Sequence, residues 1–234
     1  PGRHIDEYAQ LLEREGAALV AVLDTHMHAD HISGGVPLAN SSDVDYHLHP
    51  YDAIHPMDML PARFPYRYLK HGQQLRVGEL DIDVIGIPGH TIGQVAFMAA
   101  GHLFGGDSVF VRSIARPDLG GKPDQWTPLF YRSLRRLLEL PDETRVLPAH
   151  FSTLSEVDEQ GLCEASLGHL RKHNSGLRMA MGSEEAFARY IKESLPRFPD
   201  AYIDIKRVNA GLMEADEAKA EELETGKNVC ALGG

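Results

Sequence analysis

The sequence predicts a layered α/β fold, in a single domain over residues 1–234 with a helical C-terminal part from about residue 156. Short apolar or alternating runs typical of strands are interleaved with segments of helical periodicity. No internal repeat and no long linker interrupts this pattern. Apolar residues make up 43% of the chain, which is enough for a buried core.

The elements follow one another as short strands separated by helices. Strands are expected at residues 18–23, 44–49, 80–84, in a hairpin around Gly101 within 94–107, and at 144–150. A first helix is expected at residues 5–15, with Gly16 as the stop. Two more are expected to begin after N-cap residues, one after Thr127 with Pro128 in its first position and one after Ser183. An acidic, solvated helix is expected over 213–225.

The charge balance limits the partners. Acidic residues outnumber basic ones, 34 against 23, for a formal net charge of −11. This argues against nucleic acid and against an anionic membrane surface. No apolar run is long enough for a membrane span, and no signal-peptide pattern is seen, so neither feature is expected. Cys163 and Cys230 lie far apart and predict no disulfide framework, so a cytoplasmic location is expected.

The segment "DTHMHADHISGG" (24–35) crowds metal-capable side chains behind the strand at 18–23. His26 and His28 leave the strand end on one side, because residues two apart in a strand point the same way. Asp30 and His31 follow in the turn beyond it. Four titratable groups packed together would repel one another without a cation. Nitrogen and oxygen donors without a thiolate suit zinc, iron or manganese.

Three later segments repeat this layout of a metal-capable residue just after an apolar run. They are "IGIPGHT", "LFGGD" and "VLPAH", which end at or near His90, Asp107 and His150. Strand ends on one side of a layered sheet are where α/β proteins build their sites. The other histidines, including the pair His47 and His49, are interpreted as structural.

The motifs "THMHADH", "GHT", "GGD" and "PAH", in this order, resemble those of the metallo-β-lactamase superfamily over nearly the whole chain. The resemblance implies an αββα sandwich with metals at one edge between two sheets. Family members usually open with two further strands before the region of "PGRHIDEY", so these strands are expected to be missing here.

The superfamily hosts many reactions, so the fold alone does not decide function. The string Arg-Pro-Asp-Leu in "RSIARPDLGG" (112–121) is similar to that of persulfide dioxygenases. The leading expectation is therefore an iron(II) enzyme that oxidises a low-molecular-weight thiol persulfide with O2 to sulfite. In that branch one Fe(II) per chain is implied on His26, His90 and Asp107. The resemblance then assigns the orientation of ligands and bound water to His28, Asp30, His31 and His150. It assigns substrate binding to Thr91, Arg116 and Asp118. Arg116 is also able to hold the site loop by pairing with Asp118.

The alternative is a hydrolase of glyoxalase II type acting on a thioester or related ester with two zinc ions. The resemblance then implies His26, His28 and His90 on one metal, and Asp30, His31 and His150 on the other, with Asp107 as the bridge. Phe151 and Ser152 follow Pro-Ala-His where glutathione-specific dioxygenases have Asp-Tyr, so the thiol carrier stays open. The oligomeric state is left open too, with a homodimer as one possibility. A metal-keeping sensor without turnover is the least favoured class, because the ligand set is intact.

Overall fold

The computed structural model describes residues 1–225 and 230–232 of the 234-residue chain. Its contacts divide the chain into two compact units. Unit 1 comprises residues 1–69 with 198–228, and unit 2 comprises residues 70–197 with 229–234. Each unit has its own sheet and its own buried core. The expectation of a single domain stays a prediction.

Unit 1 is built on a small parallel sheet. Its strands lie in the order β1-β2-β3, with β1 paired to β2 and β2 paired to β3, all parallel. The core of this unit joins Val22 of β1 and Leu48 of β2 to Leu38 of α2. The elements are α1 (Asp6–Glu15), β1 (Ala21–Leu23), α2 (Gly35–Ser41), β2 (Asp45–Leu48), β3 (Arg67–Tyr68), α7 (Ala201–Asn209) and α8 (Glu217–Glu224).

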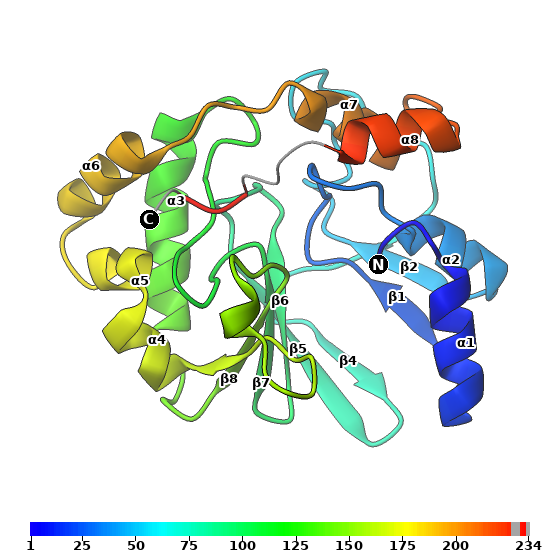
Figure 1. The fold of residues 1–234 in the computed structure, drawn as a ribbon, viewed down its shortest axis with the longest axis horizontal. Coiled ribbons are helices and arrows are strands. Elements are labelled where there is room, and N and C mark those ends of the chain that lie inside the picture. Colours follow the sequence, from blue (N-terminus) through cyan, green and yellow to red (C-terminus); the bar gives the residue numbers. More distant parts are fainter. Residues whose placement is uncertain (226–229, 233–234) are drawn as a thin grey trace. The chain divides into compact units, whose positions relative to one another are not determined.

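Unit 2 is built on a six-stranded sheet of order β4-β5-β6-β7-β8-β9, antiparallel except for the parallel pair β7–β8. Helices α3 to α6 gather beside this sheet (Figure 1), and their core joins Leu103 and Val146 of the strands to Phe130 and Phe187 of the helices. The elements are β4 (Gln74–Val77), β5 (Leu80–Gly86), β6 (Val95–Ala99), β7 (His102–Gly106), α3 (Pro123–Leu137), β8 (Arg145–Pro148), the 3-10 turn η1 (Leu154–Glu156), β9 (Ala165–Ser166), α4 (Leu167–His173), α5 (Ser175–Ala180) and α6 (Glu184–Ser194).

Several local predictions are confirmed. The hairpin around Gly101 forms from β6 and β7, and its two turn residues Ala100 and Gly101 both have positive φ, 47° and 79°. Such a turn matches the right-handed twist of the strands. Helix α1 stops at Gly16, which is left-handed. Ser183 caps α6 by accepting from the N–H of Ala186.

The predicted start of α3 is wrong. The helix begins at Pro123, so Thr127 and Pro128 lie inside it and Thr127 is no cap. A proline at the first helical position costs little, because the first N–H groups of a helix have no partner within it. Trp126 is buried in the extra turn and packs so closely on Gly120 that a Cβ there would lie 2.3 Å from its ring. This packing was not visible in the sequence.

The acidic tail is helical only over α8, and it is not fully solvated. Ala220 and Leu223 of α8 are buried, and Glu224 is partly buried and hydrogen-bonded within unit 1. No helix in the described part of the chain is long and apolar enough to cross a membrane.

Candidate metal centre

The four potential ligands of the 24–35 segment lie beyond the carboxyl end of β1. The N–H of Asp24 still donates to the carbonyl of His47 on the neighbouring strand, at 3.1 Å, and the chain then leaves the sheet. The rings of His26 and His28 lie 4.4 Å apart, centroid to centroid, and those of His28 and His31 lie 4.3 Å apart. Residues that are close in the sequence therefore present their imidazoles together.

His28, Asp30 and His31 form a set that can hold a cation. One ligand atom of each lies within 4.8 Å of the others. Nδ1 of His28 is buried and has no hydrogen-bond partner among the described residues. Its other ring nitrogen, Nε2, lies 3.8 Å from Oδ1 of Asp24. A carboxylate behind one nitrogen, with the other nitrogen directed to a metal, is a common arrangement for a ligating histidine.

Buried polar groups hold this segment in place. Asp24 accepts a hydrogen bond from the hydroxyl of Tyr46 at 2.7 Å. Burial alone would raise the pKa of Asp24, but the His28 imidazole and the Tyr46 hydroxyl outweigh it and lower this pKa to about 2. The N–H of Met27 donates to Oδ2 of Asp52 at 2.9 Å. The carboxylates of Asp24 and Asp52 thus hold the backbone and the imidazole of His28 through contacts within the protein.

In unit 2, His90, Asp107 and His150 also meet. Asp107 and His150 follow β7 and β8, and the ends of these two strands adjoin because the strands are parallel neighbours. Oδ2 of the fully buried Asp107 lies 3.5 Å from Nε2 of His90 and 3.2 Å from Nε2 of His150. Nδ1 of His90 donates to the carbonyl of Arg116 at 2.8 Å. This hydrogen bond makes Nε2 the metal-capable nitrogen of His90.

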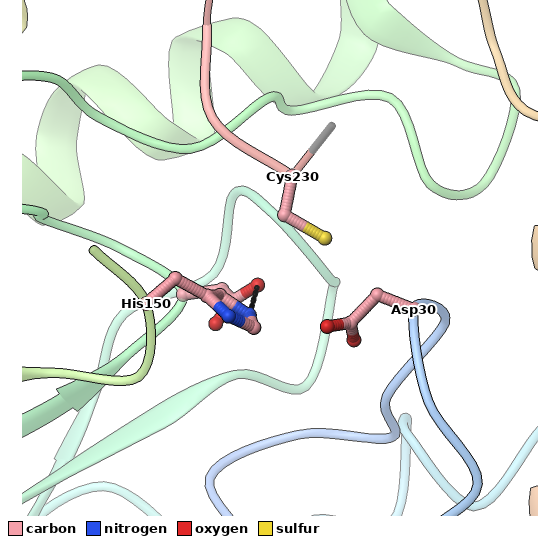
Figure 2. Close-up of side chains that lie close together, drawn as sticks. Asp30, His150 and Cys230 are labelled. Carbon is pink, nitrogen blue, oxygen red and sulfur yellow. Dashed lines mark ion pairs between the residues drawn. The ribbon is translucent and has the colours of Figure 1, made fainter. Parts of the chain in front are cut away.

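Cys230 joins this set, although it is not among the predicted ligands. Figure 2 shows its side chain close to that of His150, and one ligand atom each of Cys230, Asp107 and His150 lies within 4.8 Å of the others. The cysteine is buried, and its carbonyl accepts from the N–H of Arg116 at 2.9 Å. In the sequence, its place in "NVCALGG" is only weakly similar to a cysteine near the C-terminus of some persulfide dioxygenases. Its place here depends on backbone contacts with a segment far away along the chain.

The three residues predicted to bind substrate are all buried. The guanidinium of Arg116 makes a bidentate pair with Asp118, Nε to Oδ1 at 2.6 Å and Nη2 to Oδ2 at 2.9 Å. Nη2 also donates to the carbonyl of Pro196 at 2.9 Å. The carbonyl of Thr91 accepts from the N–H of Gly89 at 2.9 Å. The contacts of Arg116 and Asp118 are those of residues that hold a loop, and a substrate role for all three stays a prediction.

The seven predicted ligands are divided between the two units. Unit 1 brings together His26, His28, Asp30 and His31, and unit 2 brings together His90, Asp107 and His150. The donors of these seven residues are imidazole nitrogens and carboxylate oxygens. Such donors suit zinc or iron.

Comparison with known proteins identifies the family. Residues 1–150 match the model of the metallo-β-lactamase superfamily. The chain belongs to this superfamily, and the predicted α/β fold class is confirmed. Members of this superfamily are metal-dependent enzymes, and the clusters of histidine and aspartate described above agree with that.

Among curated proteins, the chain is similar to bacterial hydroxyacylglutathione hydrolases. It is 32% identical to the one from Xanthomonas campestris pv. campestris (strain B100) over 186 residues, which is 79% of this chain and 65% of that protein. It is 35% identical to the one from Vibrio cholerae serotype O1 (strain ATCC 39541 / Classical Ogawa 395 / O395) over 150 residues, 62% of this chain and 53% of that protein. The matched region thus spans less than two thirds of the relatives' length.

Among solved structures, ETHE1 from Myxococcus xanthus is 28% identical with a TM-score of 0.73, and the match covers 91% of this chain and 87% of that one. TTHA1623 in a di-iron-bound form is 30% identical with a TM-score of 0.59, covering 75% and 86%. A metallo-β-lactamase from Staphylococcus aureus subsp. aureus COL is 24% identical with a TM-score of 0.76, covering 92% and 64%, and supports the fold alone.

Proposed function

We propose that the protein is a metal-dependent hydrolase of glyoxalase II type that cleaves a thioester with two metal ions. The observation that carries this proposal is the ligand set of His28, Asp30 and His31 in unit 1. If His28 only supported other ligands through hydrogen bonds, its buried Nδ1 would have a hydrogen-bond partner, because buried polar atoms nearly always do. A nitrogen that binds a cation needs no such partner.

The relatives support the same choice. The hydroxyacylglutathione hydrolases are named for the hydrolysis of a glutathione thioester, and the di-iron form of TTHA1623 holds two metal ions. This reverses the order of the two hypotheses drawn from the sequence, in which the dioxygenase led. The identity of the two metals in this chain, zinc or iron, is part of the test.

The ligand roles are those that the family resemblance implies. By that resemblance His26, His28 and His90 would hold one metal, Asp30, His31 and His150 would hold the other, and Asp107 would be shared by both. Bound metals of this kind supply a hydroxide at neutral pH and polarise the substrate carbonyl.

Protein groups that surround the ligands fix their orientation. The Arg116 carbonyl orients the ring of His90, and the hydroxyl of Thr25 lies 3.0 Å from Nδ1 of His26. In both histidines the second nitrogen, Nε2, is thereby the ligating one. Asp24 lies behind Nε2 of His28 and leaves Nδ1 for the metal.

A second candidate function is persulfide dioxygenation, and one observation favours it. The Arg-Pro-Asp-Leu string at residues 116–119 is of the dioxygenase type, and its first residue holds His90 through the backbone carbonyl. In this reading His26, His90 and Asp107 would hold a single Fe(II), and a persulfide would be converted with O2 and water to sulfite and the free thiol. His31 and His150 then contact no metal.

Metal counts on purified variants separate the two functions. For the hydrolase we expect about two metals in the wild type and about one in His31→Ala and His150→Ala, since each removes a direct ligand of the second metal. His102→Ala, which changes an exposed histidine on β7, is the matched control and keeps both metals. Thioester hydrolysis and O2 uptake with a fresh persulfide are measured on the same samples.

One iron per chain in the wild type, His31→Ala and His150→Ala, with O2 uptake and no thioester cleavage, would overturn the hydrolase in favour of the dioxygenase. A protein that turns over neither substrate contradicts both functions.

A further inference from the structure

The turn that carries Asp30 and His31 is held by the last residue of α7. The side-chain amide of Asn209 uses both ends: Oδ1 accepts from the N–H of Ser33 at 2.8 Å, and Nδ2 donates to the carbonyls of His28 at 3.0 Å and His31 at 2.9 Å. An asparagine amide offers two donor hydrogens and an acceptor oxygen, so these three bonds use both of its hydrogens and its oxygen.

The last residue of α8 holds the same turn from a second point. Oε1 of Glu224 accepts from the N–H of Ile32 at 2.8 Å, while Oε2 accepts from Nε of Arg3 at 2.7 Å. Arg3 also pairs with Glu217 at the start of α8. One carboxylate therefore links the ligand turn to the N-terminal segment.

The turn depends on these side chains because no helix or strand hydrogen bonds hold its backbone. Residues 29–32 lie in neither a helix nor a strand. Four backbone groups between His28 and Ser33 are instead bonded to two side chains from the C-terminal helices. A metal site needs its ligands placed within about 0.5 Å, and that requires a rigid support.

We propose that Asn209 and Glu224 are positioning residues that set the geometry of the metal ligands in the 28–33 turn. This inference rests on the proposed metal function of His28, Asp30 and His31. It gives the C-terminal helices α7 and α8 a specific role, which is to hold the ligand turn in the shape that binds a cation.

Two pairs of variants test the role of each hydrogen bond. Asn209→Ala removes all three bonds, while Asn209→Asp keeps the size and the acceptor but sets a carboxylate oxygen against two carbonyl oxygens. Glu224→Ala removes both contacts, while Glu224→Gln keeps an acceptor for Ile32 and removes the charge facing Arg3. The control is Glu221→Ala, an exposed position on the same helix α8.

The assay is competition for zinc between the full-length chain and a metallochromic chelator, together with the absorption spectrum of the cobalt-substituted protein. We expect both Asn209 variants to bind zinc about 10- to 100-fold more weakly, as is typical when a group supporting a ligand is lost. Glu224→Gln should retain tighter binding than Glu224→Ala. The cobalt spectra of the weak binders should change, whereas a residue that only stabilises the fold would leave the spectrum unaltered.

Circular dichroism of the metal-free proteins verifies that each variant is folded. The inference fails if Asn209→Ala and Glu224→Ala bind zinc like the wild type with an unchanged cobalt spectrum, or if Glu221→Ala weakens binding as much as they do. A wild type that binds neither zinc, cobalt nor iron contradicts the proposed function itself, so the two failures are distinct.

Discussion

Replacing Arg116 by alanine should destabilise the fold rather than merely weaken substrate binding. The side chain is fully buried, and Asp118 is 5% exposed. Their bidentate pair, at 2.6 and 2.9 Å, is accompanied by bonds from Arg116 to the carbonyls of Pro196 and Arg197. Arg116→Ala leaves the Asp118 carboxylate buried without this cation, which typically costs about 3–5 kcal/mol of unfolding free energy.

Two further variants make the expectation specific. Arg116→Ala combined with Asp118→Ala removes both charges, so the loss should fall short of the sum of the single losses by about 0.5–3 kcal/mol. Arg76→Ala, in the same unit, is the control: its side chain is 62% exposed and pairs with Asp81, itself 43% exposed, at 2.9 Å. An exposed pair of this kind contributes about 0–1 kcal/mol.

Urea unfolding followed by fluorescence measures these differences. Trp126 is the only tryptophan in the sequence and is buried, so its emission reports unfolding. If Arg116→Ala keeps the wild-type unfolding midpoint and instead raises KM, the reasoning from burial is refuted and the prediction of a substrate-binding arginine stands.

Three other outcomes are expected. In Gly89→Ala the new Cβ would lie 2.3–2.5 Å from atoms of Phe130. We therefore expect the free energy of unfolding, measured in urea, to fall by about 1–3 kcal/mol, and the adjacent His90 to retain metal more weakly. A variant as stable as the wild type would contradict this close packing. His55 is buried, its Nε2 lies 3.1 Å from the carbonyl of Ile203, and its Nδ1 accepts from the N–H of Asp58 at 3.0 Å. Burial lowers the pKa of His55 below 6.5, although the Ile203 carbonyl and Asp58 oppose the shift. Near the pKa, the folded state therefore binds fewer protons than the unfolded state. The contribution of neutral His55 to the free energy of unfolding is fully present above pH 6.5. It is lost as the pH falls through 6.5 toward the lower folded-state pKa. His55→Gln should flatten this dependence in urea titrations at pH 7.5 and 5.5, and an unchanged slope would count against the assignment. Removal of metal by a chelator should abolish turnover and lower the thermal midpoint, because a ligand that binds only the folded state stabilises it; activity that survives complete metal removal would exclude metal-dependent catalysis.

Local features of the fold were predictable because their signals are local. The hairpin at Gly101, the cap at Ser183 and the stop at Gly16 each depend on a residue with a particular backbone or capping preference. The start of α3 was not predictable in this way, because Trp126 is drawn into the helix by packing against Gly120.

What the sequence determined by itself is the superfamily and the identity of the candidate metal ligands. His26, His28, Asp30 and His31 are neighbours in the chain, so their meeting in unit 1 needs little long-range folding. Their residue types restrict the chemistry to cations that prefer nitrogen and oxygen. That all seven ligands bind metal stays a prediction.

Only the tertiary structure showed which groups support those ligands. Asn209 and Glu224 bond to the ligand turn from helices near the other end of the chain, and Cys230 joins Asp107 from the C-terminal segment. Asparagine and glutamate are ordinary surface residues, and nothing in their neighbouring sequence distinguishes them. Hydrogen bonds between distant segments are decided by how the chain packs, and local periodicity and capping preferences carry no information about that packing.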